Sequence, residues 1–268
     1  MKKFLSSAAA AAFCVSGLLA APAAHAAVFV SQLVYKDNNS NPPSLSATPY
    51  GTVTITELTP DSLKVEVDLT NPASEFVNTG GKHNPFVFNT LHADQVTTPH
   101  AAATDDPNAI AIDAPVGKFE DAGRGAFEST PFGTFTNEIS LNPEGDKGKG
   151  NGQANGQKGP MIFTVTDPNG ITFAGIGATF SSTGQLLTTG TGDRFTSTTT
   201  GADNAGWWFA ADIYDGATGS TYNVAARDAF EQIQNAVPEP ATWGLMIVGF
   251  GGVGAVLRRR RATVAALA

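Results

Sequence analysis

The chain has 268 residues, of which 41% are hydrophobic and 15% charged, with 29 glycines, 16 prolines and 17 phenylalanines. Glycine and proline interrupt regular structure, whereas phenylalanine suits pleated, half-buried surfaces, so this composition favours short strands joined by many turns. Residues 27–237 contain 10 basic and 23 acidic residues, a net charge of −13. The segment lacks the clustered Lys and Arg that phosphate contacts need, which excludes nucleic acid as an expected partner.

The first 26 residues have the pattern of a secretory signal peptide. Two lysines precede an apolar stretch, and Ala24 and Ala26 form the small-x-small site that signal peptidase recognises. Cleavage after Ala26 would also remove Cys14, the only cysteine. The sequence therefore predicts an N-terminal signal helix and a mature domain, residues 27–236, without a disulfide.

Two segments early in the mature domain alternate apolar and polar residues with a period of two. They span residues 52–58 and 63–69, with a turn at 59–62 between them. Such alternation across a short turn predicts a β-hairpin, with the charged residues between 64 and 68 facing water. The apolar side chains expected to face one core are Val53, Ile55, Leu58, Leu63, Val65, Val67 and Leu69.

Further strands and loops are predicted around this hairpin. We expect strands at residues 28–35 and 86–88, and a polar loop at 37–46. Residues 92–118 lack a lasting period and predict a long loop or an irregular edge, and residues 142–160 lack large apolar residues and predict a mobile surface loop. Four phenylalanines among glycines are expected to be scattered core residues: Phe119, Phe127, Phe132 and Phe135.

The second half of the domain carries one strong turn signal and one aromatic strand. Asn169-Gly170 between residues 161–166 and 171–180 predicts a second hairpin. In the strand expected at 207–214, the consecutive rings of Trp207 and Trp208 must point to opposite faces, one inward and one outward. A short helix is expected at 225–235. Together these elements predict an all-β body, an antiparallel β-sandwich of jelly-roll-like type.

The end of the chain has the pattern of a short membrane span. Residues 241–257 form 17 consecutive residues without a charge, about 26 Å as a helix, which approaches the roughly 30 Å of a hydrocarbon core. Trp243 lies at the outer edge, and four arginines follow, Arg258, Arg259, Arg260 and Arg261. The positive-inside tendency predicts a single transmembrane helix with its arginines in the cytoplasm and the domain outside.

The order of these features resembles a known sorting signal. Pro238, Glu239 and Pro240 precede Trp243, a Gly-rich apolar segment and the arginine cluster, as in the PEP-CTERM signal of Gram-negative bacteria, a signature also called the ice-binding protein C-terminal domain. The resemblance covers residues 237–261. It implies recognition by an exosortase at Pro-Glu-Pro, a transient hold in the inner membrane, release to the cell surface or the extracellular matrix, and a role in exopolysaccharide or biofilm formation.

Other motifs are weaker. Residues 249–254 satisfy the dinucleotide pattern G-x-G-x-x-G, but no strand precedes them, so the match is false. Ice binding would need a flat, regularly repeated array, which the threonine run at 196–200 does not supply. We therefore expect no cofactor.

Metal binding is not the favoured interpretation. The spacing of His83, His92 and His100 does not match zinc ligation, so ordinary loop histidines are favoured. Structural calcium stays open as an alternative, because carboxylate and amide oxygens gather in two places. These groups are Asp105, Asp106 and Asp113, and Asp37, Asn38 and Asn39.

Catalysis is likewise an alternative rather than the leading hypothesis. The pairs Glu120–Asp121 and Asp212–Asp215 suit glycoside hydrolysis in type, although solvated strand ends are the simpler interpretation. Trp207 and Trp208 are candidates for stacking on sugar rings. The leading hypothesis is a non-enzymatic exported protein, and the alternatives are a polysaccharide hydrolase and a sugar- or calcium-binding module.

Overall fold

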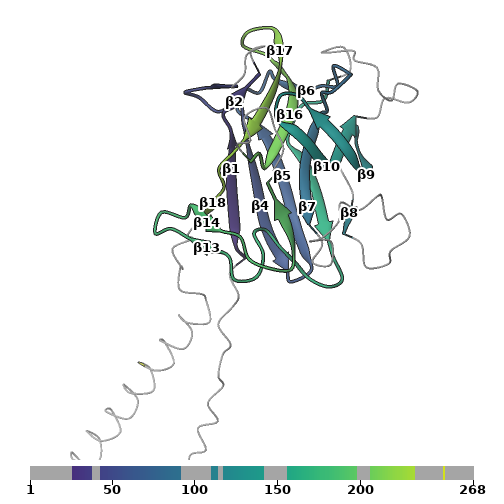
Figure 1. Ribbon diagram of the computed structural model, residues 1–268. Coiled ribbons are helices and arrows are strands. Elements are labelled where there is room, and N and C mark those ends of the chain that lie inside the picture. Colours follow the sequence, from purple (N-terminus) through teal and green to yellow (C-terminus); the bar gives the residue numbers. More distant parts are fainter. Residues whose placement is uncertain are drawn as a thin grey trace, which may run out of the picture. The chain divides into compact units, whose positions relative to one another are not determined.

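A computed structural model describes residues 26–37, 43–91, 110–113, 117–141, 156–197, 206–232 and 250. Residues 26–235 form one compact unit. Its described segments contain strands and turns and no α-helix, so the all-β prediction is confirmed (Figure 1). Within the described residues no helix has the length and hydropathy to span a membrane. The predicted signal helix and, apart from Phe250, the predicted membrane helix lie outside the described residues.

The first sheet contains the predicted hairpin. It is antiparallel throughout. β4 (Gly51–Thr59) pairs with β5 (Ser62–Leu69), with Val53 opposite Val67 and Ile55 opposite Val65, so these apolar side chains share one face of the sheet as expected. In sheet order the strands are β18 (Phe230–Gln232), β1 (Val28–Leu33), β4 (Gly51–Thr59), β5 (Ser62–Leu69), β11 (Met161–Thr166) and β8 (Ala111–Asp113).

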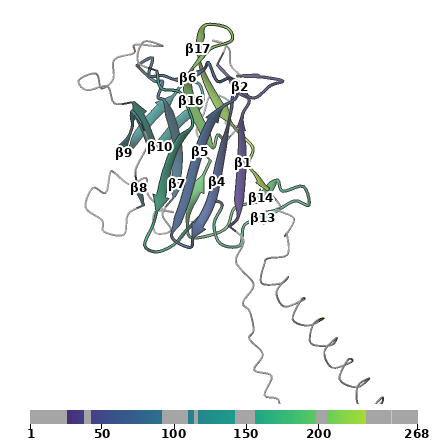
Figure 2. The ribbon, with the colours of Figure 1, turned by 180° about the vertical axis from the view of Figure 1, so that it is seen from behind.

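The second sheet is built around β7, which bonds to β10, β15 and β16; of these strands, β7, β10 and β16 are labelled in Figure 2. Its path runs β12 (Ile171–Thr172), β15 (Asp193–Thr196), β7 (Phe86–Leu91), β16 (Phe209–Asp215), β17 (Ser220–Ala226), β2 (Tyr35–Lys36) and β3 (Ser44–Leu45). Beside it lie β6 (Glu75–Phe76) on β16, β10 (Gly133–Leu141) on β7 and β9 (Phe119–Ser129) on β10. A small separate sheet pairs β13 (Thr179–Phe180) with β14 (Leu186–Thr188). Among the strand pairs of the described residues, β12–β15 is the only parallel one.

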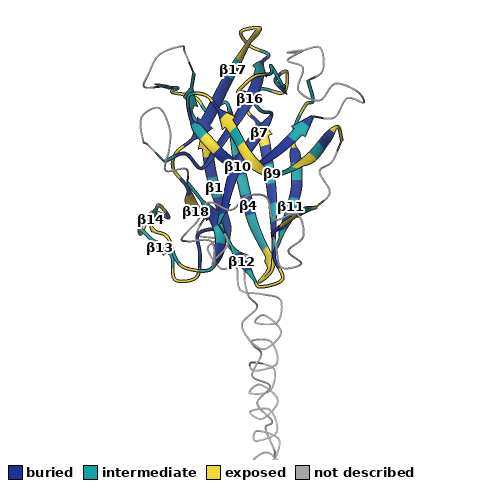
Figure 3. Ribbon diagram, turned by 45° about the vertical axis from the view of Figure 1, so that its right-hand side comes forward, coloured by how far each residue is buried: buried dark blue, intermediate teal, exposed yellow. Residues whose placement is uncertain are grey.

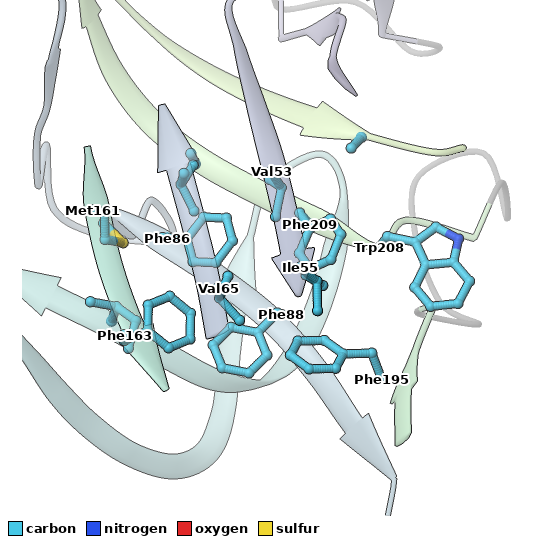
Figure 4. Packing of buried hydrophobic residues seen from close by; sticks show 14 of the residues in the cluster. Val53, Ile55, Val65, Phe86, Phe88, Met161, Phe163, Phe195, Trp208 and Phe209 are labelled. Carbon is cyan, nitrogen blue, oxygen red and sulfur yellow. The ribbon is translucent and has the colours of Figure 1, made fainter. Parts of the chain in front are cut away.

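Aromatic rings fill the space between the two main sheets. The Phe88 ring stacks on Phe163 of the first sheet at 5.5 Å and on Phe195 at 5.3 Å, while Phe86 stacks on Phe209 at 5.8 Å (Figure 4). All five side chains are at most 1% exposed. Burial of such rings removes large apolar areas from water and adds ring–ring attraction. The sheets therefore pack face to face in a β-sandwich-like arrangement.

A second, smaller apolar cluster lies on the opposite face of the second sheet. Along β16 the side chains alternate, so Ala210 joins this cluster while Phe209 and Ala211 join the main core. The Trp207 ring meets Phe132 at 4.9 Å in an edge-to-face contact. Both faces of β16 are consequently buried for most of its length (Figure 3). The buried members of the cluster are Val87, Phe132, Phe135, Trp207, Ala210 and Ala225.

The second cluster explains why both tryptophans are buried. Trp207 and Trp208 do point into different clusters, but both are buried, at 0% and 7% exposed, so the expectation that one ring faces outward is wrong. The reason is that the outer face of the second sheet is itself covered. Phe119, Phe132 and Phe135 are buried as expected, yet the β9–β10 hairpin that carries them was not predicted.

The second predicted hairpin is also wrong. Residues 167–170 do turn, with Gly170 N donating to Asp167 O at 2.9 Å and Gly170 at a φ of 94°. However, β11 pairs with β5 and β8, whereas β12 pairs with β15 in the other sheet. Local turn chemistry specifies a chain reversal but not the strand partners, and here the chain crosses between sheets.

Two smaller predictions are also wrong, the inward-facing Leu58 and the helix at 225–235. Leu58 is 52% exposed, because period two from Val53 and Ile55 places Glu57, not Leu58, on the inner face. The helix expected at 225–235 is absent from its described residues, where β17 ends at Ala226 and β18 follows.

The aromatic core gives a direct stability prediction. Replacing Phe88, which is 0% exposed and contacts rings from both sheets, with Ala should lower the free energy of unfolding by about 3–5 kcal/mol. The exposed Leu58→Ala control should change it by less than about 0.5 kcal/mol. Urea denaturation followed by tryptophan fluorescence measures both, and a Phe88→Ala loss below about 1 kcal/mol would contradict the packing described.

Candidate functional site

The loop between β6 and β7, residues 77–85, is tied to one residue of β16. Val77 N donates to the Asp212 carbonyl at 3.0 Å, and Asp212 N donates to the Asn84 carbonyl at 2.9 Å. On its other side, Thr130 N donates to the Lys82 carbonyl at 3.0 Å. Two neighbouring glycines within the loop have φ of 84° and 71°, a region that glycine adopts without steric cost. The loop is thus fixed between β16 and the β9–β10 hairpin.

The Asp212 side chain also binds this loop, through hydrogen bonds with Thr79. Its Oδ2 accepts hydrogen bonds from Thr79 N at 2.8 Å and from the Thr79 hydroxyl at 2.5 Å. That hydroxyl lies 3.2 Å from His83 Nδ1. The Thr79 hydroxyl donates its proton to the carboxylate, so it can only accept from the imidazole. We therefore assign a proton to His83 Nδ1, which donates to the Thr79 hydroxyl oxygen.

Asp212 is only 1% exposed, and burial raises its pKa to about 6, while the Thr79 hydrogen bonds and the charge of His83 act in the opposite direction. Among the residues that the structure describes, Oδ1 has no hydrogen-bond partner. A carboxylate oxygen that is buried and unbonded is costly, which marks this position as functional or strained.

Asp212 lines a cleft of about 300 Å³, which we call the Asp212 cleft. Asn223 forms part of its wall and is held in place by Ser129, because Asn223 Nδ2 donates to Ser129 Oγ at 2.9 Å. The Lys36 ammonium lies 4.3 Å above the Tyr222 ring, a cation–π contact. The lining residues are Lys36, Asp37, His83, Asp212, Thr221, Tyr222 and Asn223.

A second cleft, of about 260 Å³, lies on the other side of His83 and contains two carboxyl groups, Glu120 and Glu138. We call it the Glu138 cleft. Glu138 is 7% exposed, and burial, with the nearby charge of Glu120, raises its pKa to about 7. Ser140 Oγ donates to Glu120 Oε1 at 3.3 Å. The two acids of this cleft therefore occupy different environments, as acid–base pairs do.

Several predicted site residues lie apart from these clefts. Glu120 lines the Glu138 cleft, but Asp121 accepts from Gly123 N at 2.8 Å in its own strand. Asp215 accepts from Ala217 N and the Thr218 hydroxyl in the β16–β17 turn, away from the loop that Asp212 holds. Neither predicted carboxylate pair therefore forms one site.

The two tryptophans are core residues, and neither presents the exposed ring face that stacking on a sugar requires. Of the histidines, His83 lines both clefts, whereas His92 and His100 lie outside the described residues, as do Asn38, Asn39, Asp105 and Asp106. Asp37 lines the Asp212 cleft, and Asp113 lies in β8. The described part of the chain contains no group of three or more His, Cys, Asp or Glu side chains suited to a metal ion.

Sequence reasoning missed Thr79 and Glu138. Thr79 carries no signal of its own, because its partner Asp212 lies 133 residues away. Glu138 did carry one, since an acid in the middle of the β-prone run Phe135 to Leu141 has to be either solvated or buried at a cost.

The raised pKa of Glu138 predicts a pH-dependent stability difference. The folded state binds this proton more tightly than the unfolded chain, whose value lies near 4.5, so native stability falls as pH rises from about 4.5 to above 7. Glu138→Gln removes this loss. The variant should be more stable than the wild type by roughly 1–3 kcal/mol at pH 8, and the difference should vanish below about pH 4.

Urea denaturation at pH 4, 6 and 8 measures this difference. The matched control is Asp228→Asn, at an exposed acid between β17 and β18, which should change stability by less than about 0.5 kcal/mol. A Glu138→Gln variant less stable than the wild type at pH 8 would contradict the assignment.

The end of the chain is similar to a known sorting motif. Residues 236–261 match the family model described as the PEP-CTERM protein-sorting motif. No curated protein and no solved structure matches the chain. The match confirms the resemblance drawn from Pro238, Glu239 and Pro240, Trp243 and the arginine cluster, all of which lie outside the described residues. It implies export, transient membrane anchoring and an exosortase as processing partner. The chain thus carries, at residues 236–261, the PEP-CTERM sorting signal of an exported, exosortase-processed protein.

Proposed function

We propose that the chain is a non-enzymatic binding protein that an exosortase releases to the cell surface or the extracellular matrix, where it takes part in exopolysaccharide or biofilm formation. The observation that carries this proposal is the sorting motif at residues 236–261. In this proposal signal peptidase cleaves after Ala26, the segment 241–257 holds the chain in the inner membrane as a helix, and the arginines keep its end in the cytoplasm. The body then acts outside the membrane, as a sandwich whose connectivity we expect to be jelly-roll-like.

A binding role agrees with how the groups of the Asp212 cleft are used. His83 Nδ1 is engaged by Thr79, and Asp212 Oδ2 accepts two hydrogen bonds from the same residue. Groups that anchor a loop hold a binding surface in a fixed shape. Fixed shape favours binding because little conformational entropy is lost when a ligand is bound.

The sorting step is tested in cells that carry an exosortase. Pro238→Ala/Glu239→Ala should abolish release, so that the chain accumulates in the membrane fraction at its unprocessed mass, because the recognised motif is gone. Cell fractionation with mass spectrometry of the surface form measures this. The control Thr263→Ala, beyond the matched residues, should be processed normally. Normal processing and release of the double variant would refute the sorting proposal.

A second candidate function is hydrolysis of a polysaccharide. It is favoured by the Glu138 cleft, where a buried acid with a pKa of about 7 and Glu120 line the same wall. A carboxyl group that stays protonated near pH 7 can act as general acid while its partner acts as base or nucleophile.

This candidate predicts that the chain releases reducing ends from the exopolysaccharide of its own cells. In that case Glu138→Gln should lower the rate by about 10²-fold or more, whereas Asp228→Asn, at an exposed acid between β17 and β18, should not change it. Reducing-end assays across pH 5 to 8 decide the point. A rate that is absent, or equal in the wild type and Glu138→Gln, rejects the hydrolase and leaves the binding role.

A further inference from the structure

We propose that the Asp212 cleft binds one ring of a neutral polyhydroxylated ligand, a sugar unit, through the Asp212 carboxylate and the Lys36 ammonium. This inference rests on the proposed function of the body as a binding module and specifies its ligand class and its site. The site differs from the tryptophan pair that the sequence suggested.

One carboxylate oxygen of Asp212, Oδ1, is unsatisfied among the described residues. Asp212 is 99% buried, lines the cleft, and has one oxygen without a hydrogen-bond partner among the described residues. Leaving a buried acceptor unpaired costs about 1–3 kcal/mol, and more for a charged group. A ligand hydroxyl placed at this oxygen would donate to it and remove that cost.

Side chains of opposite charge line the same small cleft. Lys36 offers ammonium donors, whereas Asp212 and Asp37 offer carboxylate acceptors. A cationic ligand would be opposed by Lys36, and an anionic ligand by the two acids. A hydroxyl group both donates and accepts, so a neutral ligand with several hydroxyls satisfies both kinds of group without an unpaired charge.

The Asp212 cleft has fixed walls and a volume that suits a small ligand. Asn223 and Ser129 fix one wall by paired hydrogen bonds, and Thr79 fixes the Asp212 carboxylate. The cleft volume of about 300 Å³ lies at the lower end of the range for small-molecule sites. The site therefore suits a single ring, such as the end or a side branch of a glycan.

A direct test uses the full chain in a zwitterionic detergent whose headgroup is not a sugar. The probes are glucose, galactose, mannose and N-acetylglucosamine as neutral ligands, with glucosamine and glucuronate as charged counterparts. Saturation-transfer NMR detects binding, and titration gives the dissociation constants. At least one neutral sugar should bind with a dissociation constant below about 10 mM, and its charged counterpart at least about tenfold more weakly.

Two variants place the binding in the cleft. Asp212→Asn should weaken binding of that sugar at least tenfold. Because Asp212 also anchors the loop, a second variant, Thr221→Trp, fills the cleft mouth from an exposed position and should abolish binding without lowering the thermal midpoint. The matched controls are Glu66→Gln on the other sheet and Thr134→Trp at an exposed position of β10, and both should bind as the wild type does.

The outcomes separate this inference from the proposed function. If no neutral sugar binds while the tail is still processed and released, the ligand class is wrong and the exported role stands. If a sugar binds equally well to the wild type and Thr221→Trp, the body is a binding module but this cleft is not its site. If only glucosamine or only glucuronate binds, the neutral assignment is overturned.

Discussion

The structure depends on one strand that is buried on both faces. β7 sends Phe86 and Phe88 into the core between the sheets and Val87 into the second cluster, and it bonds to three other strands. A strand covered on both sides has no solvated face, which is why apolar residues occupy three consecutive positions at its start, Phe86 to Phe88. Because β7 is fixed in this way, the loop that precedes it lies beside β16 and forms hydrogen bonds with Asp212.

The second cluster and the Asp212 cleft are neighbours along β16. On the outer face of this strand the side chains pass from Ala210, which is packed in the cluster, to Asp212, which binds the loop. Apolar packing thus ends where the polar anchor begins. The burial that makes Asp212 a good anchor is also the main cause of its raised pKa, so the geometry of the loop and its electrostatics share one origin.

Two acids on either side of His83 have pKa values raised by burial, to about 6 and about 7. An exported domain with an excess of acids has ample exposed carboxylates for solubility, and these two are not among them. Their position in clefts separates them from the surface acids.

The sorting signal, the all-β class and the β4–β5 hairpin can be predicted from the amino-acid sequence, because each depends on short-range order: a linear motif or a period of two around one turn. Tertiary structure alone decided the partners of β11 and β12, the burial of both tryptophans and the β9–β10 hairpin. It also decided the site, since Thr79 and Asp212 meet across 133 residues. Local pattern says which face of a strand is apolar, but not what covers the other face, and here that cover makes the second cluster.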